Sequence, residues 1–274
     1  MSDPSLHFFG PPSTTVVLLA HGAGAGQESH FMQAMAMGLA EHDCRVGLFD
    51  FHYMARAQRE GRRRPPEPMS RLIECWQQAI ELAIGEGARR LVIGGKSMGG
   101  RVASMIYEQT VEAVGLVCLG YPFHPIGKPD RLRVEHLQDI GKPVLVIQGE
   151  RDGLGNREQV AGYRLPDHFQ FEWLCDGDHS FKPRKASGYT LEQHQQRLVV
   201  GRTLVGPQPC GEVLHGGALV ARLCLDPGAV ALGARLPARL LDDAAAAAVD
   251  AAVAPPPQQP SSPRQRRALR TFFM

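Results

Sequence analysis

The segment GKSMG around Ser97 (residues 95–99) has the spacing of a serine nucleophile held on a sharp turn between a strand and a helix. The apolar run Arg90–Gly95 ends at this turn, and Gly99–Gln109, whose apolar residues have helical spacing, follows at once. Glycine on both sides of the serine lets neighbouring backbone approach closely, and the start of a helix favours developing negative charge. We therefore predict that Ser97 is a nucleophile. The alternative is an ordinary glycine-rich turn.

A nucleophilic serine requires a histidine that removes its proton and an acid that orients the histidine. On this kind of turn the chain order is serine, acid, histidine. Asp152 follows the apolar run Pro143–Gln148, and His179 follows the run Phe169–Leu174, so both are expected at the carboxyl ends of strands. The sequence therefore predicts a catalytic triad of Ser97, Asp152 and His179. Three nearby carboxylates are rival acids: Glu150, Asp176 and Asp178.

The segment HGAG (residues 21–24) directly follows the apolar run Thr15–Ala20. In folds with a serine on such a turn, a loop near the nucleophile and the residue after it supply the two oxyanion donors. We predict that these donors are the backbone N–H groups of Ala23 and Met98, with a plain glycine-rich turn as the alternative. His21 itself is expected to be structural.

Several side chains in loops near the predicted strand ends are expected to line a substrate site: Tyr53, Met54, Tyr121, Phe123 and His124. Tyr121 and Phe123 could equally pack the loop that carries them. The basic segment GRRRPP (residues 61–66) is either a solvated loop or an electropositive rim for an anionic ester or thioester. Lys96 could favour negative charge beside the nucleophile, although a solvated side chain is the more ordinary interpretation.

Short apolar runs alternate along the chain with longer segments of helical spacing. Six runs are expected to be strands: Thr15–Ala20, Arg45–Asp50, Arg90–Gly95, Val114–Leu119, Pro143–Gln148 and Phe169–Leu174. Helices are expected over Phe31–His42, Ser70–Glu86 and Gly99–Gln109. Continuous apolar strands alternating with helices predict an α/β, doubly wound, mostly parallel sheet. The connection over residues 120–142 is too short for a cap domain.

Charge and cysteine content narrow the class of protein. Lys and Arg total 30 against 28 Asp and Glu, so no global field favours nucleic acid or an anionic membrane as partner. The six cysteines lack metal-ligand spacing and are typical of reduced thiols in the cytoplasm. The segment Met1–Pro12 lacks the pattern of a secretory signal, and no apolar run has membrane-spanning length. We expect no metal and no cofactor. The sequence leaves the oligomeric state open.

Composition changes sharply near residue 200. From residue 201 onward the chain contains no Lys, Ile, Asn, Tyr or Trp, while Ala, Pro, Gly, Arg and Leu dominate. We predict an α/β domain over residues 1–200 and a low-complexity, Ala/Pro/Arg-rich, partly disordered extension over 201–274. A shifted reading frame in a GC-rich gene is the alternative origin of this segment.

Taken together, these motifs resemble the α/β-hydrolase superfamily, and within it the dienelactone-hydrolase-like branch of KANL/Tex-type hydrolase-like proteins, as a bacterial member. The matching stretches span about residues 14–195: HGAG at 21, FHYM at 51, GRRRPP at 61, GGKSMGGR at 94, GYPFHPIGKP at 120, QGERD at 148 and GDHSFKPRKASG at 177. The resemblance implies the α/β-hydrolase fold and the same triad, but no substrate. The chain departs from the pattern near Gln195, which puts the final helix of the fold in doubt.

Two functions remain open at this point. The first is a serine hydrolase that cleaves a small carboxylic ester or thioester through an acyl-enzyme. The second is a catalytically silent interaction module, because the branch includes a subunit of an acetyltransferase complex and a fold does not determine a function. The complete set of serine, acid and histidine favours the hydrolase.

Overall fold

The computed structural model describes residues 4–200, apart from the side chain of Val200. These residues belong to the first of two compact units, Met1–Ala234, whereas the second unit, Arg235–Met274, lies outside the described part. The predicted domain boundary and the extension predicted over 201–274 also lie outside the described residues. They therefore stay predictions.

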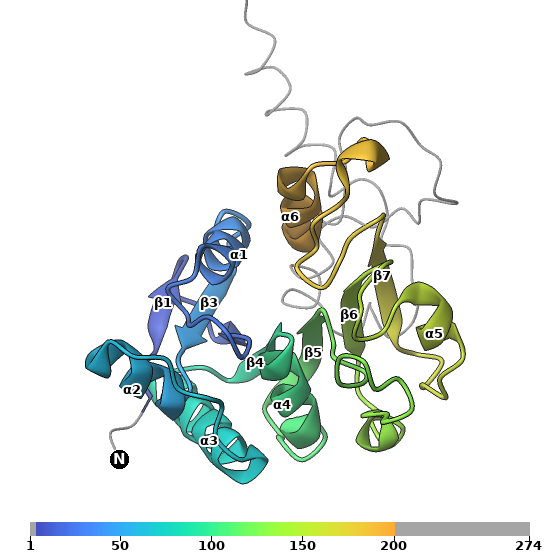
Figure 1. Cartoon of the computed structure of the whole chain (residues 1–274). Coiled ribbons are helices and arrows are strands. Elements are labelled where there is room, and N and C mark those ends of the chain that lie inside the picture. The colour runs from blue at the N-terminus through green and yellow to red at the C-terminus, as the bar shows by residue number, and fades with distance from the viewer. Residues whose placement is uncertain (1–3, 201–274) are drawn as a thin grey trace, which may run out of the picture. The chain divides into compact units, whose positions relative to one another are not determined.

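A seven-stranded sheet forms the centre of the described structure (Figure 1). Its spatial order is β1-β3-β2-β4-β5-β6-β7, and every neighbouring pair is parallel except β1 and β3. The strands are β1 (His7–Phe9), β2 (Thr15–Ala20), β3 (Arg45–Phe49), β4 (Arg90–Lys96), β5 (Ala113–Leu119), β6 (Val144–Gly149) and β7 (Gln170–Leu174). Six of them are the predicted runs to within a residue at each end. The sequence analysis missed β1, which is too short to show a hydrophobic pattern.

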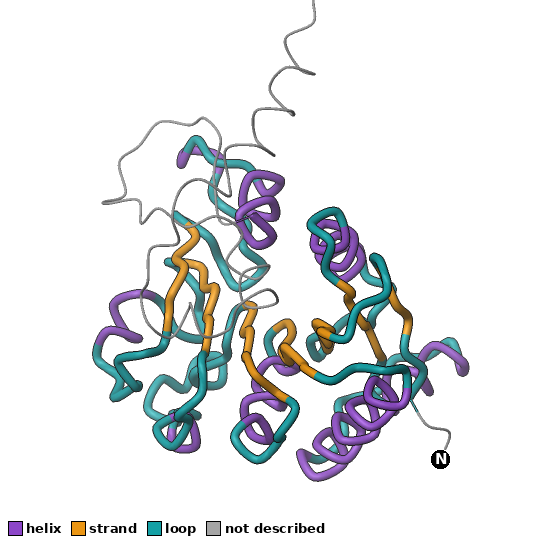
Figure 2. The backbone as a smooth tube through the Cα atoms, turned by 180° about the vertical axis from the view of Figure 1, so that it is seen from behind, coloured by secondary structure: helices purple, strands orange, loops and turns teal. Residues whose placement is uncertain are grey.

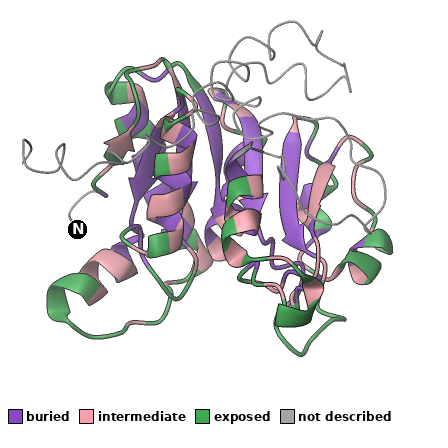
Figure 3. Cartoon of the chain, turned by 90° about the horizontal axis from the view of Figure 1, so that it is seen from above, coloured by how far each residue is buried: buried purple, intermediate pink, exposed green. Residues whose placement is uncertain are grey.

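Helices cover both faces of the sheet (Figures 1 and 2). They are α1 (His30–Ala40), α2 (His52–Glu60), α3 (Met69–Gly85), α4 (Met98–Tyr107), α5 (Arg157–Ala161) and α6 (Leu191–Val200), with 3₁₀ turns η1 (Glu135–Leu137) and η2 (Lys185–Ser187). Apolar residues of α1 and α6 pack on one face, and those of α3 and α4 pack on the other. The central strands β2 to β6 are therefore buried on both faces, whereas the edge strands β1 and β7 are only partly buried (Figure 3). This is the predicted doubly wound α/β fold.

The connections of the fold explain two further features. Between β5 and β6 the chain forms only the turn η1, so the described structure contains no cap domain there.

Helix α6 forms despite the departure of the sequence near Gln195, and this corrects the doubt about the final helix. Its residues Leu198 and Val199 are buried in the same cluster as α1, where Val199 lies against Gly38.

Candidate active site

Ser97 lies in the sharp turn between β4 and α4. Its backbone has φ 50° and ψ −111°, a conformation that residues other than glycine rarely adopt and that stores strain. The turn has no room for side chains at Gly95 and Gly99, because a Cβ there would lie 2.1 Å and 2.4 Å from the carbonyl oxygen of Ala20. The backbone at the end of β2 therefore packs directly against the turn, at the carboxyl edge of the sheet.

The three side chains of the predicted triad form a continuous chain of hydrogen bonds. His179 Nε2 lies 2.9 Å from Ser97 Oγ, and His179 Nδ1 lies 2.8 Å from Asp152 Oδ2. Asp152 is completely buried, whereas His179 is partly exposed. A carboxylate only accepts hydrogen bonds, so Nδ1 carries the proton and Nε2 is free to accept the hydrogen of Ser97. The arrangement has the geometry of a serine activated by a histidine base.

The rival acids have other partners. Glu150 forms an ion pair with Arg157 at 2.8 Å, and Asp178 accepts backbone hydrogen bonds within its own loop. Hydrogen bonds from Arg184 hold the pKa of Asp176 at about 2, and this carboxylate also accepts from Arg151. Of the four candidate carboxylates, Asp152 is the one within hydrogen-bonding distance of the His179 ring.

A comparison with known families agrees with this fold. A family model described as an alpha/beta hydrolase domain matches residues 13–203, which is more than half of the chain. The chain belongs to the α/β-hydrolase family.

Solved structures of similar fold include several α/β-hydrolases. The esterase Est1E from Butyrivibrio proteoclasticus, bound to ferulic acid, is 13% identical with a TM-score of 0.51 and covers 65% of this chain and 88% of its own. An α/β serine hydrolase without lid from Xanthomonas campestris is 17% identical with a TM-score of 0.52, covering 64% and 80%. An esterase from Pyrococcus furiosus is 18% identical with a TM-score of 0.53, covering 64% and 77%. At this identity the likeness shows the fold alone.

In this member of the α/β-hydrolase family, buried polar groups bind the HGAG loop after β2. His21 Nε2 accepts from the backbone N–H of Phe51 at 3.1 Å, and Nδ1 donates to Gly22 O at 2.6 Å. Burial lowers the pKa of His21, which favours the neutral ring that these bonds require. The hydroxyl of Tyr53 donates to Ala23 O at 3.1 Å. These contacts agree with the structural role predicted for His21.

One predicted oxyanion donor follows Gly22, where a Cβ would lie 3.7 Å from Ser97 Cβ, and the other follows Ser97 directly. Ala23 is exposed in the loop after β2, and Met98 is the first residue of α4. Within residues 4–200, neither backbone N–H donates a hydrogen bond. Both groups therefore have the hydrogen-bonding capacity that an oxyanion requires, and their role stays a prediction.

Gln148, at the end of β6, supports the acid and was missed by the sequence analysis. Its Nε2 donates to Asp152 Oδ2 at 2.9 Å, and its Oε1 accepts from the backbone N–H of Tyr121 at 2.7 Å. The N–H of Leu154 donates to the other oxygen, Asp152 Oδ1, at 2.8 Å. The sequence signal for this role is an amide side chain at the end of an apolar run. The structure buries it completely, and a buried amide needs hydrogen-bond partners.

Lys96, the residue before the nucleophile, ties the histidine loop to β4. Its Nζ donates to the carbonyl oxygen of His179 at 2.6 Å and lies 4.6 Å from the ring centroid of Phe181. Burial lowers the pKa of Lys96 to about 8, although Asp152 and Asp178 attract its charge. The interpretation of Lys96 as a solvated side chain was wrong, because its ammonium group binds the loop that carries the base.

The side chains predicted to line the substrate site differ from that expectation. Four of them are almost completely buried, with exposed fractions of 1% for Tyr53, 1% for Tyr121, 0% for Phe123 and 2% for His124. Their polar atoms bind backbone, as in the bonds from Tyr121 to Arg133 O and between His124 and Pro125 O. Met54 is partly exposed and packs against the core. Packing of the loops, the alternative given for Tyr121 and Phe123, accounts for this burial.

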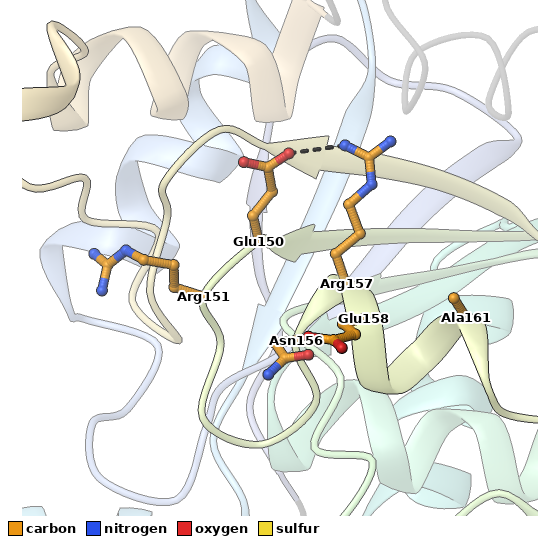
Figure 4. A pocket seen from close by; sticks show the side chains of 6 residues that line it. All are labelled: Glu150, Arg151, Asn156, Arg157, Glu158 and Ala161. Atoms are coloured by element: carbon orange, nitrogen blue, oxygen red, sulfur yellow. Dashed lines mark hydrogen bonds and ion pairs between the residues drawn. The ribbon is translucent and has the colours of Figure 1, made fainter. Parts of the chain in front are cut away.

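A surface hollow of about 600 Å³ lies on the side of β6 that faces α5 (Figure 4). It is lined by Glu150, Arg151, Asn156, Arg157, Glu158 and Ala161, and none of the triad residues lines it. Figure 4 shows Glu150 paired with Arg157 across it. Because its main charges are already paired and it lies off the nucleophile, we do not assign the substrate to this hollow.

Two further observations concern the described residues only. Across residues 4–200, no group of three or more His, Cys, Asp or Glu side chains could hold a metal ion. The helices in this part of the chain are all too short or too polar to cross a membrane.

Proposed function

We propose that this protein is a serine hydrolase that cleaves a small carboxylic ester or thioester through an acyl-enzyme. The observation that carries the proposal is the hydrogen-bonded chain from Ser97 through His179 to the buried Asp152, at 2.9 Å and 2.8 Å. The strained turn at Ser97 adds support, because it presents the hydroxyl at the carboxyl edge of the sheet.

The reaction follows from this geometry. His179 Nε2 accepts the Ser97 proton as Oγ attacks the carbonyl carbon, and the N–H groups of Ala23 and Met98 stabilise the oxyanion. The intermediate then collapses: His179 protonates the leaving alcohol or thiol, and the acyl group stays on Ser97. A water molecule attacks the acyl-enzyme while His179 accepts its proton. The carboxylic acid leaves, and Ser97 recovers its hydrogen. Throughout, Asp152 stabilises the protonated ring.

Several proteins of similar fold are described as esterases or serine hydrolases, which makes this class of reaction the natural one to test. We also propose membership of the dienelactone-hydrolase-like branch and a cytoplasmic location, on the motifs and cysteines of the sequence. The proposed chemistry uses the side chains of the chain without a cofactor, and the proposed partner is a small-molecule substrate rather than nucleic acid or a membrane.

The test is hydrolysis of p-nitrophenyl acetate and of an acyl-thioester by the full chain. Ser97→Ala and His179→Ala should each lower kcat by at least about 10³-fold, as removal of a triad member does elsewhere. Ser70→Ala is the matched control, because Ser70 is exposed at the start of α3. Equal activity of Ser97→Ala and wild type would refute the proposal.

A further inference from the structure

An arginine lies one helical turn beyond the nucleophile. Arg101 is four residues after Ser97 in α4, and its backbone N–H donates to Ser97 O at 3.0 Å. Residues four apart lie on the same face of a helix, and helical side chains lean toward the N-terminus. Arg101 therefore lies on the same face of α4 as Ser97, one turn further along the helix.

A second arginine is held beside α4 by the chain between β5 and β6. The backbone N–H of Arg133 donates to Phe123 O at 2.8 Å, and the hydroxyl of Tyr121 donates to Arg133 O at 3.0 Å. Further along, His136 Nε2 lies 2.9 Å from Ser104 Oγ of α4. These bonds hold the backbone of Arg133 in the connection that packs against α4, the helix that carries Arg101.

The positive charge in this region is not neutralised by the described residues. Within residues 4–200, neither Arg101 nor Arg133 has a carboxylate within ion-pair distance, and Arg101 Nε is buried with no hydrogen-bond partner. Burial and then the positive charge of Arg101 lower the pKa of Arg133. By contrast, Arg62 and Arg64 of the basic loop both bind Glu60.

We propose that Arg101 and Arg133 form a subsite for an anionic group, a carboxylate or phosphate, carried by the substrate. A planar guanidinium binds such oxygens through paired hydrogen bonds, and an anion would compensate the two positive charges that no carboxylate neutralises. The subsite lies about 6 Å along α4 from Ser97, the rise of four helical residues. This inference rests on the proposed hydrolase function and narrows its substrate class to anionic esters or thioesters.

The test compares two substrates of similar size, mono-p-nitrophenyl succinate, which is anionic, and p-nitrophenyl butyrate, which is neutral. Arg101→Gln and Arg133→Gln should each lower the ratio of kcat/KM for the anionic over the neutral ester by about tenfold, the effect of losing one charge-assisted hydrogen bond. Arg101→Lys should recover part of the ratio. Arg89→Gln is the control, because Arg89 is exposed before β4, at the opposite end of this strand from Ser97. An unchanged ratio in both glutamine variants would overturn the subsite while leaving the hydrolase intact.

A binding measurement separates this inference from the hydrolase proposal. Calorimetric titration of the full-length Ser97→Ala protein with succinate and with inorganic phosphate, at constant ionic strength, needs no turnover. Adding Arg133→Gln should weaken binding of the preferred anion about tenfold, and the stronger of the two ligands identifies the group. If neither ester is hydrolysed but this loss is observed, the hydrolase proposal fails and the anion subsite stands. Equal binding with and without Arg133→Gln, or no binding of either anion, would overturn the subsite.

Discussion

Replacement of Lys96 by methionine measures how much the buried charge of this lysine lowers the free energy of unfolding. Burial depresses the pKa of Lys96 from 10.5 to about 8 in the folded protein. Between these values the unfolded chain binds more protons than the folded chain, so the contribution of Lys96 to the free energy of unfolding rises with pH. The full shift corresponds to about 3 kcal/mol in the free energy of unfolding. The wild type is therefore less stable by this amount below about pH 8 than at alkaline pH. Methionine fills the same space with no charge to bury.

The assay is urea unfolding of wild type and Lys96→Met at about pH 7 and about pH 9.5. From the linkage relation, the wild type should gain about 2 kcal/mol relative to the variant across this interval. The partial exposure of Lys96 makes this figure an upper bound, and other titrating groups cancel because both proteins share them. Lys96→Met should also lower kcat, because the contact from Nζ to His179 O is lost. A difference in stability that stays constant with pH would show that Lys96 is not buried as a charge in the folded protein.

Three further predictions concern groups around the turn. Gln148→Leu should lower the free energy of unfolding by about 1–3 kcal/mol, measured in urea, because it removes a donor from the buried Asp152; an unchanged midpoint would contradict this. Gly99→Ala should lower the free energy of unfolding by about 1–3 kcal/mol and abolish turnover, because its Cβ would lie 2.4 Å from Ala20 O. Normal melting and activity of this variant would show that the turn has room for a side chain. The free energy of unfolding of Ser97→Gly should exceed that of Ser97→Ala by about 1 kcal/mol, because glycine tolerates the positive φ at this position. The reverse order would argue against strain.

The parallel strands and main helices could be predicted because their signals are local and long. Continuous apolar runs gave six strands to within a residue, and helical spacing gave α1, α3 and α4 nearly to their ends. Strand β1 gave no such signal, since three residues at a sheet edge need no apolar pattern. Helix α2 was also missed. Most of its residues are polar, and only His52 and Tyr53 at its start are buried, so the sequence shows no apolar helical pattern.

The site was predictable where residue order and type determine the chemistry. Ser97, Asp152 and His179 could be selected by their positions after strands, and the structure brings all three within hydrogen-bonding distance. The surroundings could not be selected in this way. Whether Lys96 is solvated, or whether Tyr121 faces substrate or core, depends on contacts between segments that are distant in sequence.

Labelling of the purified full-length protein by a fluorescent fluorophosphonate shows whether Ser97 is a nucleophile, because this reagent reacts only with an activated serine. We expect that wild type is labelled, that Ser97→Ala is not, and that His179→Ala is labelled at least about 10²-fold more slowly. Absence of labelling in a folded wild type, or equal labelling of Ser97→Ala, would contradict the assignment of Ser97 as nucleophile.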